Sequence, residues 1–164
     1  MEYEIENHSK FDLEKYKELV EELLEFAGDE LDLDHGVKVV FIHNAENSKN
    51  PLGKTAFYLP SEETIAVYAT DRHIKDMLRS MVHELIHHKQ KERGEFEDNS
   101  KQAKPGYAIE DKELRDIERE AYEEGNLIFR TFEDKLKTKK FENAEMEALS
   151  KRLKDKFGFK FHVD

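Results

Sequence analysis

The feature that most constrains the fold is residues 80–90, Ser-Met-Val-His-Glu-Leu-Ile-His-His-Lys-Gln, in which no residue breaks a helix. On a helix, His83 and His87 lie one turn apart on the same face. Their imidazoles can therefore converge on one metal ion at ~2 Å. Glu84 lies about 100° further round the helix, where it can reach a water on that metal. The pattern predicts two metal ligands and a general base on one rigid element.

The surroundings of this motif are apolar on most sides of the predicted helix, which indicates burial. The apolar neighbours are Ile74, Met77, Leu78, Met81, Val82, Leu85 and Ile86. Two histidines and a glutamate in such a helix are costly unless partners satisfy them. A metal ion would satisfy all three, and we favour it over the alternative of a hydrogen-bonded core cluster.

Composition limits the function classes that remain. The 164 residues suggest one domain, residues 1–164. A net charge of −11 argues against a nucleic-acid partner. The sequence has no cysteine, which excludes disulfides and thiolate ligands. The acidic amino-terminal segment is not a secretion signal, and no apolar run is long enough for a membrane span. We therefore expect a soluble, cytoplasmic protein without a membrane partner.

Hydrophobic patterning in the first half predicts one helix and a small sheet. Helical spacing of apolar residues covers residues 10–27, and Gly28 would end this helix. Residues 37–42 form a β-branched strand, and residues 44–54 a loop. Two further strands, residues 55–59 and 64–69, are separated by a short turn and form a hairpin. The expected sheet is three-stranded and mainly antiparallel.

The second half is predominantly helical. The helix with the two histidines should begin after residues 70–71 and continue to about Arg93. A polar loop, residues 95–107, is a candidate lid. A long helix over residues 110–137 and a final helix over residues 143–157 follow. Residues 159–163 alternate like a short closing strand. The predicted fold class is α+β.

A catalytic zinc site usually has three protein ligands, so a third must come from elsewhere. On the long helix, Ile117, Glu120, Glu124 and Leu127 share one face, whereas Glu118 would point elsewhere. Carboxylates between apolar neighbours on a helix are candidate ligands, although solvated glutamates are the ordinary alternative. Gly125 costs ~1 kcal/mol inside a helix relative to alanine, and a close approach of two helices would explain it.

These residues resemble the motifs of the gluzincin metallopeptidases. His83-Glu84-x-x-His87 is followed, 33 residues after His87, by Glu120-Ala121-x-x-Glu124. The resemblance implies zinc as cofactor, with His83, His87 and Glu120 as ligands. Glu124 would take the place of an aspartate that orients the first histidine, from which it departs by one methylene. The order of elements is similar to that of minimal gluzincins, including small putative peptidases encoded by phages and prokaryotes.

The function expected from this resemblance is hydrolysis of peptide bonds in a peptide or protein substrate. Glu84 would act as general base on a metal-activated water. The strand over residues 64–69 would correspond to the family's edge strand, which pairs with extended substrate.

Neither the residue that stabilises the oxyanion nor the catalytic role itself follows from the motif alone. Candidates for oxyanion stabilisation are Tyr107, Tyr122, His88 and His162, although His88 should point away from the metal. The principal alternative function is a non-catalytic binding or regulatory module with a structural zinc. A protease acting on DNA-bound proteins is disfavoured by the net charge.

Overall fold

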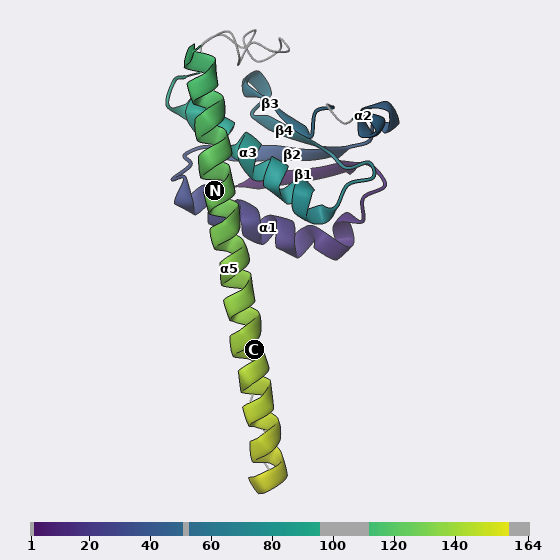
Figure 1. Ribbon diagram of the computed structural model, residues 1–164, viewed down its shortest axis with the longest axis vertical. Helices are drawn as coiled ribbons and strands as arrows, with labels where there is room; N and C mark the ends of the chain where they lie inside the picture. The colour runs from purple at the N-terminus through teal and green to yellow at the C-terminus, as the bar shows by residue number, and fades with distance from the viewer. Residues whose placement is uncertain (1, 51–52, 96–111, 158–164) are drawn as a thin grey trace. The chain divides into compact units, whose positions relative to one another are not determined.

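The computed structural model describes residues 2–50, 53–95 and 112–157 and confirms the α+β class (Figure 1). The chain divides into two compact units, residues 1–129 and 130–164. Every residue of the candidate site lies in the first unit. The single domain predicted for residues 1–164 stays a prediction.

A four-stranded mixed sheet forms the centre of the first unit. Its strands are β1 (Tyr3–His8), β2 (Val37–Ile42), β3 (Ala56–Leu59) and β4 (Thr64–Tyr68), in the order β1-β2-β4-β3. β1 pairs with β2, and β2 with β4, in parallel, whereas β3 pairs with β4 antiparallel. The predicted hairpin is thus confirmed.

The prediction of a three-stranded, mainly antiparallel sheet is wrong. It missed β1, whose charged residues alternate with Tyr3 and Ile5 and were interpreted only as an acidic terminus. Helix α1 connects β1 to β2, and a crossover of this kind makes two strands parallel. β4 lies between β2 and β3, so the expectation that residues 64–69 form an edge strand is also wrong.

Two helices cover one face of the sheet. α1 (Leu13–Glu30) packs against β1, and α3 (Ile74–Glu92) packs against β3 and β4. The two helices also contact each other, which places them on the same side. The fully buried side chains between helices and sheet include Val20, Leu23, Leu24, Val39, Phe41, Ile65, Met81 and Leu85. This core holds α3, and with it both histidines, rigidly against the sheet.

Several predicted element bounds shift in the structure. Asp12 caps α1 by accepting from the N–H of Lys15, and Gly28 lies buried inside the helix instead of ending it. A short helix, α2 (Ala45–Lys49), occupies part of the predicted loop. α3 begins at Ile74, where the side chain of His73 caps it.

A single helix, α5 (Lys112–Phe157), replaces the two helices predicted at residues 110–137 and 143–157. No glycine or proline lies between residues 126 and 157, so no residue there ends the helix. The predicted lid, apart from Glu95, and the predicted closing strand lie outside the described residues. None of the described helices is both long and apolar enough to span a bilayer.

Candidate metal centre

His83 and His87 lie one turn apart on α3, as the sequence predicted, and their rings are 5.0 Å apart between centroids. Both Nε2 atoms face the same carboxylate, that of Glu118 on α5. Oε2 of Glu118 lies 3.2 Å from Nε2 of His83, and Oε1 lies 3.1 Å from Nε2 of His87. Two nitrogens and a carboxylate from two helices therefore converge on one point.

The carboxylate at this point is Glu118, and the prediction that Glu120 would take this place is not what the structure shows. Glu120 instead accepts hydrogen bonds from Gln90 and Arg93. The reason is the rotational phase of α5. Glu118, Ala121 and Gly125 share the face that meets α3, and a Cβ on Gly125 would lie 3.3 Å from Cα of His83. The close approach predicted for Gly125 is therefore confirmed.

The distances suit a metal ion. Two ligand atoms that are each ~2.0–2.1 Å from a tetrahedral zinc ion lie about 3.3 Å apart. The two nitrogen–oxygen distances to Glu118, 3.2 and 3.1 Å, are close to this value. One ligand atom from each of His83, Glu84 and His87 also lies within 4.8 Å of the others. These three side chains could hold a metal ion. Glu118 contacts the two imidazoles directly, as in a hydrogen-bonded ion pair, and a cation bound there would replace those contacts.

The charges of this cluster are those of an ion pair between His87 and Glu118. Burial lowers the pKa of His87, but its contact with Glu118 and the charge of Glu84 outweigh burial and raise the pKa to about 9. Burial raises the pKa of Glu118, but hydrogen bonds from His83 and His87 outweigh it, so that the pKa lies well below its usual range. Without metal, the proton therefore stays on the imidazole and the carboxylate stays ionised.

Glu84 lies beside this cluster and is only 9% exposed. Burial raises the pKa of Glu84, and the nearby His87 and His83 oppose that effect. Glu84 and His83 also line a cavity of about 240 Å³, together with Ser80, Tyr122 and Asn126. A water or substrate group in this cavity would meet Glu84 and the His83 side of the cluster together.

Gln90 is a site residue that the sequence reasoning missed. It is fully buried, and its Oε1 lies 2.7 Å from Nδ1 of His87. Its Nε2 donates to the carbonyl of Ile117 and to Glu120, both at 2.9 Å. Because Nε2 must donate in both bonds, Oε1 accepts from His87, which leaves Nε2 of His87 for a metal. Gln90 follows His87 by three residues on the same helix, and this spacing alone indicates that the two side chains can contact each other.

The remaining residues that the sequence predicted for the site are Glu124 and the four candidates for oxyanion stabilisation. Glu124, predicted to orient a histidine, is exposed on α5. Tyr122 is 66% exposed and lines the cavity beside Glu84 as well as a second one, of about 420 Å³, beside Glu118. His88 is fully buried and bonds Tyr58 and the carbonyl of His35, away from the cluster as expected. Tyr107 and His162 lie outside the described residues.

Comparison with known proteins adds no family: no family model matches the chain, and neither a curated protein nor a solved structure matches it significantly. The functional interpretation therefore depends on the geometry of the cluster and on the residue pattern.

Proposed function

We propose that the protein is a zinc-dependent metallopeptidase of the gluzincin type, with His83, His87 and Glu118 as metal ligands. The observation that carries the proposal is the carboxylate of Glu118, which contacts Nε2 of both histidines. Glu118 thereby takes the role that the sequence motif suggested for Glu120. Two imidazoles and one carboxylate form a donor set typical of catalytic zinc.

Glu84 is the proposed general base. Bound zinc would lower the pKa of a water toward ~7 and polarise a substrate carbonyl. Glu84 lies next to His83, so its carboxylate can accept a proton from that water and later deliver it to the leaving amine. The raised pKa that burial gives Glu84 makes its carboxylate a stronger base than an exposed one. Tyr122 lines the same cavity and is the best-placed candidate to donate a hydrogen bond to the developing oxyanion.

The substrate in this proposal is an extended peptide or protein segment. β3 is the edge strand next to α3, and it pairs with β4 on one side. An extended segment can add to the other side through main-chain hydrogen bonds. We further propose a cytoplasmic location, which the cysteine-free and highly charged composition supports.

The alternative is a module in which zinc only stabilises the fold. A structural zinc site is closed by four protein ligands, whereas a catalytic site keeps one position open. Here the cavity of about 240 Å³ reaches His83 and Glu84, which favours an accessible position. A structural site would use Glu84 as a fourth ligand beside His83, His87 and Glu118. The catalytic proposal instead leaves the carboxylate of Glu84 free to act on a water in the cavity.

The test compares Glu84→Gln with wild type, using fluorescein-labelled β-casein as substrate and elemental analysis for zinc. We expect Glu84→Gln to retain about one zinc per chain and to lose at least about 100-fold in cleavage rate. Glu124→Gln, which changes an exposed glutamate of α5, serves as the matched control and should cleave like wild type. Cleavage by Glu84→Gln at the wild-type rate would exclude the mechanism, and zinc-loaded wild type that cleaves nothing would favour the structural alternative.

A further inference from the structure

In β3, every second residue points its backbone N–H and C=O groups toward the free edge of the sheet. In an antiparallel pair, residues that bond the partner strand alternate with residues whose N–H and C=O point away from it. The N–H of Tyr68 donates to the carbonyl of Thr55 at 3.1 Å, which sets the phase of this alternation. Ala56 and Tyr58 therefore direct their backbone groups away from β4. Among the described strands, none pairs with that edge.

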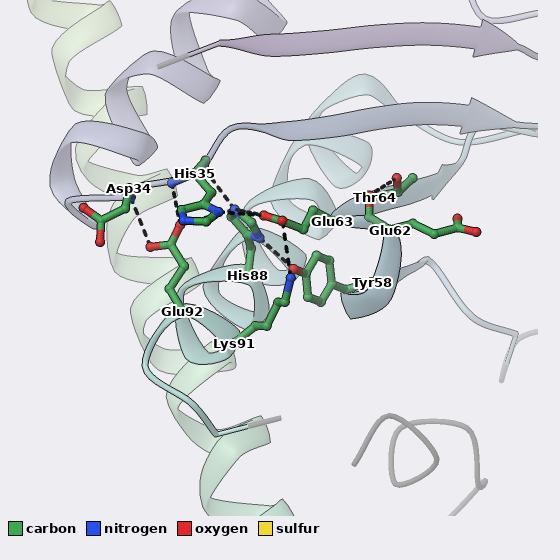
Figure 2. Close-up of polar contacts among 9 residues, drawn as sticks. All are labelled: Asp34, His35, Tyr58, Glu62, Glu63, Thr64, His88, Lys91 and Glu92. Atoms are coloured by element: carbon green, nitrogen blue, oxygen red, sulfur yellow. Dashed lines mark hydrogen bonds and ion pairs between the residues drawn. The ribbon is translucent and has the colours of Figure 1, made fainter. Parts of the chain in front are cut away.

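The side chain of Tyr58 ties this edge to the helix with the metal ligands. Its hydroxyl lies 2.6 Å from Nδ1 of His88, which directly follows His87 on α3 (Figure 2). Both side chains are buried, and their rings meet edge to face. Burial, with the charges of Glu63 and Glu92, raises the pKa of Tyr58, so its hydroxyl keeps its proton and can donate.

His88 is itself held firmly on its other side. Its Nε2 lies 3.0 Å from the carbonyl of His35, just before β2. Since a carbonyl only accepts, Nε2 carries a hydrogen, and in the neutral ring Nδ1 is then the acceptor for Tyr58. Glu92 fixes the same turn by accepting from the N–H groups of Asp34 and His35 (Figure 2). The imidazole of His88 is therefore a rigid support between α3, β3 and the turn before β2.

A second bond anchors the start of β3. Nη1 of Arg72 donates to the carbonyl of Thr55 at 2.8 Å, and its Nη2 lies 3.3 Å from Oγ of Ser80 on α3. β3 has only four residues and one paired neighbour, so its own ladder gives it little stiffness. The side-chain bonds to α3 thus determine how far its free edge lies from the histidines.

We propose that Tyr58 and His88 are positioning residues. They hold the free, peptide-binding edge of β3 at the distance from α3 that brings the peptide bond to be cleaved next to Glu84. The inference rests on the proposed peptidase function, because it assigns substrate binding to this edge. It adds that substrate affinity depends on a buried hydrogen bond that does not touch substrate or metal. Loss of that bond should weaken substrate binding and leave the metal centre intact.

The test removes one hydroxyl, with Tyr58→Phe. Tyr3→Phe is the matched control, because Tyr3 lies on the other edge strand and also donates from a half-buried hydroxyl, to the carbonyl of Leu24 at 2.7 Å. The probe is a quenched-fluorescent peptide copied from the casein bond that wild type cleaves fastest. We expect Tyr58→Phe to raise KM by about threefold, and by no more than about tenfold, which is the full worth of one hydrogen bond, with kcat and zinc affinity within twofold of wild type.

Two further readouts complete the test. In the Glu84→Gln background, the peptide's Kd should rise by the same factor with Tyr58→Phe, and amide exchange at Phe57 should accelerate. Tyr3→Phe should change neither. A KM and Kd within twofold of wild type for Tyr58→Phe, or an equal change for Tyr3→Phe, would overturn the positioning role. A wild type that neither binds nor cleaves any casein peptide would instead overturn the peptidase function itself.

Discussion

The imidazole of His87 donates its Nδ1 hydrogen to Oε1 of Gln90, 2.7 Å away. This bond fixes the ring so that Nε2 faces Glu118. Partners of this kind orient a metal-binding histidine and raise its basicity. The bond connects His87 to α5, because Gln90 also donates to Ile117 and Glu120.

The first prediction concerns Gln90→Met, which keeps the volume of the side chain and removes its acceptor. We expect zinc affinity to fall by about 10-fold to 100-fold, because His87 would lose the bond that fixes its orientation. Competition with a chromophoric chelator measures the affinity, and circular dichroism establishes that the variant is folded. An affinity within twofold of wild type would show that Gln90 only fills space.

The second prediction concerns pH. In the metal-free protein, contact with Glu118 raises the pKa of His87 to about 9, against the opposing effect of burial. Zinc and the proton compete for Nε2, so zinc uptake at pH 7 must release that proton. Protonated His87 predominates below pH 9 and is lost as pH rises through that value. Zinc affinity should therefore rise by about tenfold per pH unit between pH 7 and pH 8.5.

Calorimetry in two buffers of different ionisation enthalpy checks this release directly. The observed binding enthalpy should differ between the buffers in proportion to about one proton per zinc bound. Equal enthalpies at pH 7, or an affinity that does not change between pH 7 and pH 8, would contradict a protonated His87 in the metal-free state.

The third prediction concerns Gly125, where the backbone of α5 lies close to that of α3. A Cβ at this position would lie 3.3 Å from Cα and 3.5 Å from N of His83, which are backbone atoms. Gly125→Ala gains about 1 kcal/mol of helix propensity but must push the two helices apart by a few tenths of an ångström. We expect zinc affinity to fall several-fold while the thermal midpoint of the metal-free protein changes little, and Gly125→Val should lower affinity further. Unchanged zinc affinity in both variants would mean that the contact does not determine the position of Glu118.

The sequence predicted the part of the site that depends on local spacing. His83, Glu84 and His87 share one helix, so the 3.6-residue period alone places them. Glu118 was missed because the motif comparison, which selects Glu120, was used to choose the face of α5 that points toward α3. Gly125 indicates the correct face, since a glycine inside a helix is typical of the face that approaches a neighbouring helix. Glu118 precedes Gly125 by two turns on that same face.

The errors in the sheet have a different origin. β1 pairs with β2 over a separation of 34 residues, with Tyr3 opposite Val37, and local patterning does not predict such a partner. The β3–β4 hairpin was predicted because its two strands are joined by a short turn. The hairpin could be predicted because its strands are neighbours in the sequence. The pairing of β1 with β2 was missed because the two strands are far apart in the sequence.

The most direct test of the metal centre compares zinc affinity in Glu118→Ala and Glu120→Ala, two changes of the same kind two residues apart on one helix. Glu118 contacts both imidazoles, whereas Glu120 accepts from Gln90 and Arg93. We predict a loss of at least about 100-fold for Glu118→Ala and of less than about tenfold for Glu120→Ala. The reverse order, with Glu120→Ala losing zinc and Glu118→Ala retaining it, would contradict the metal centre described here.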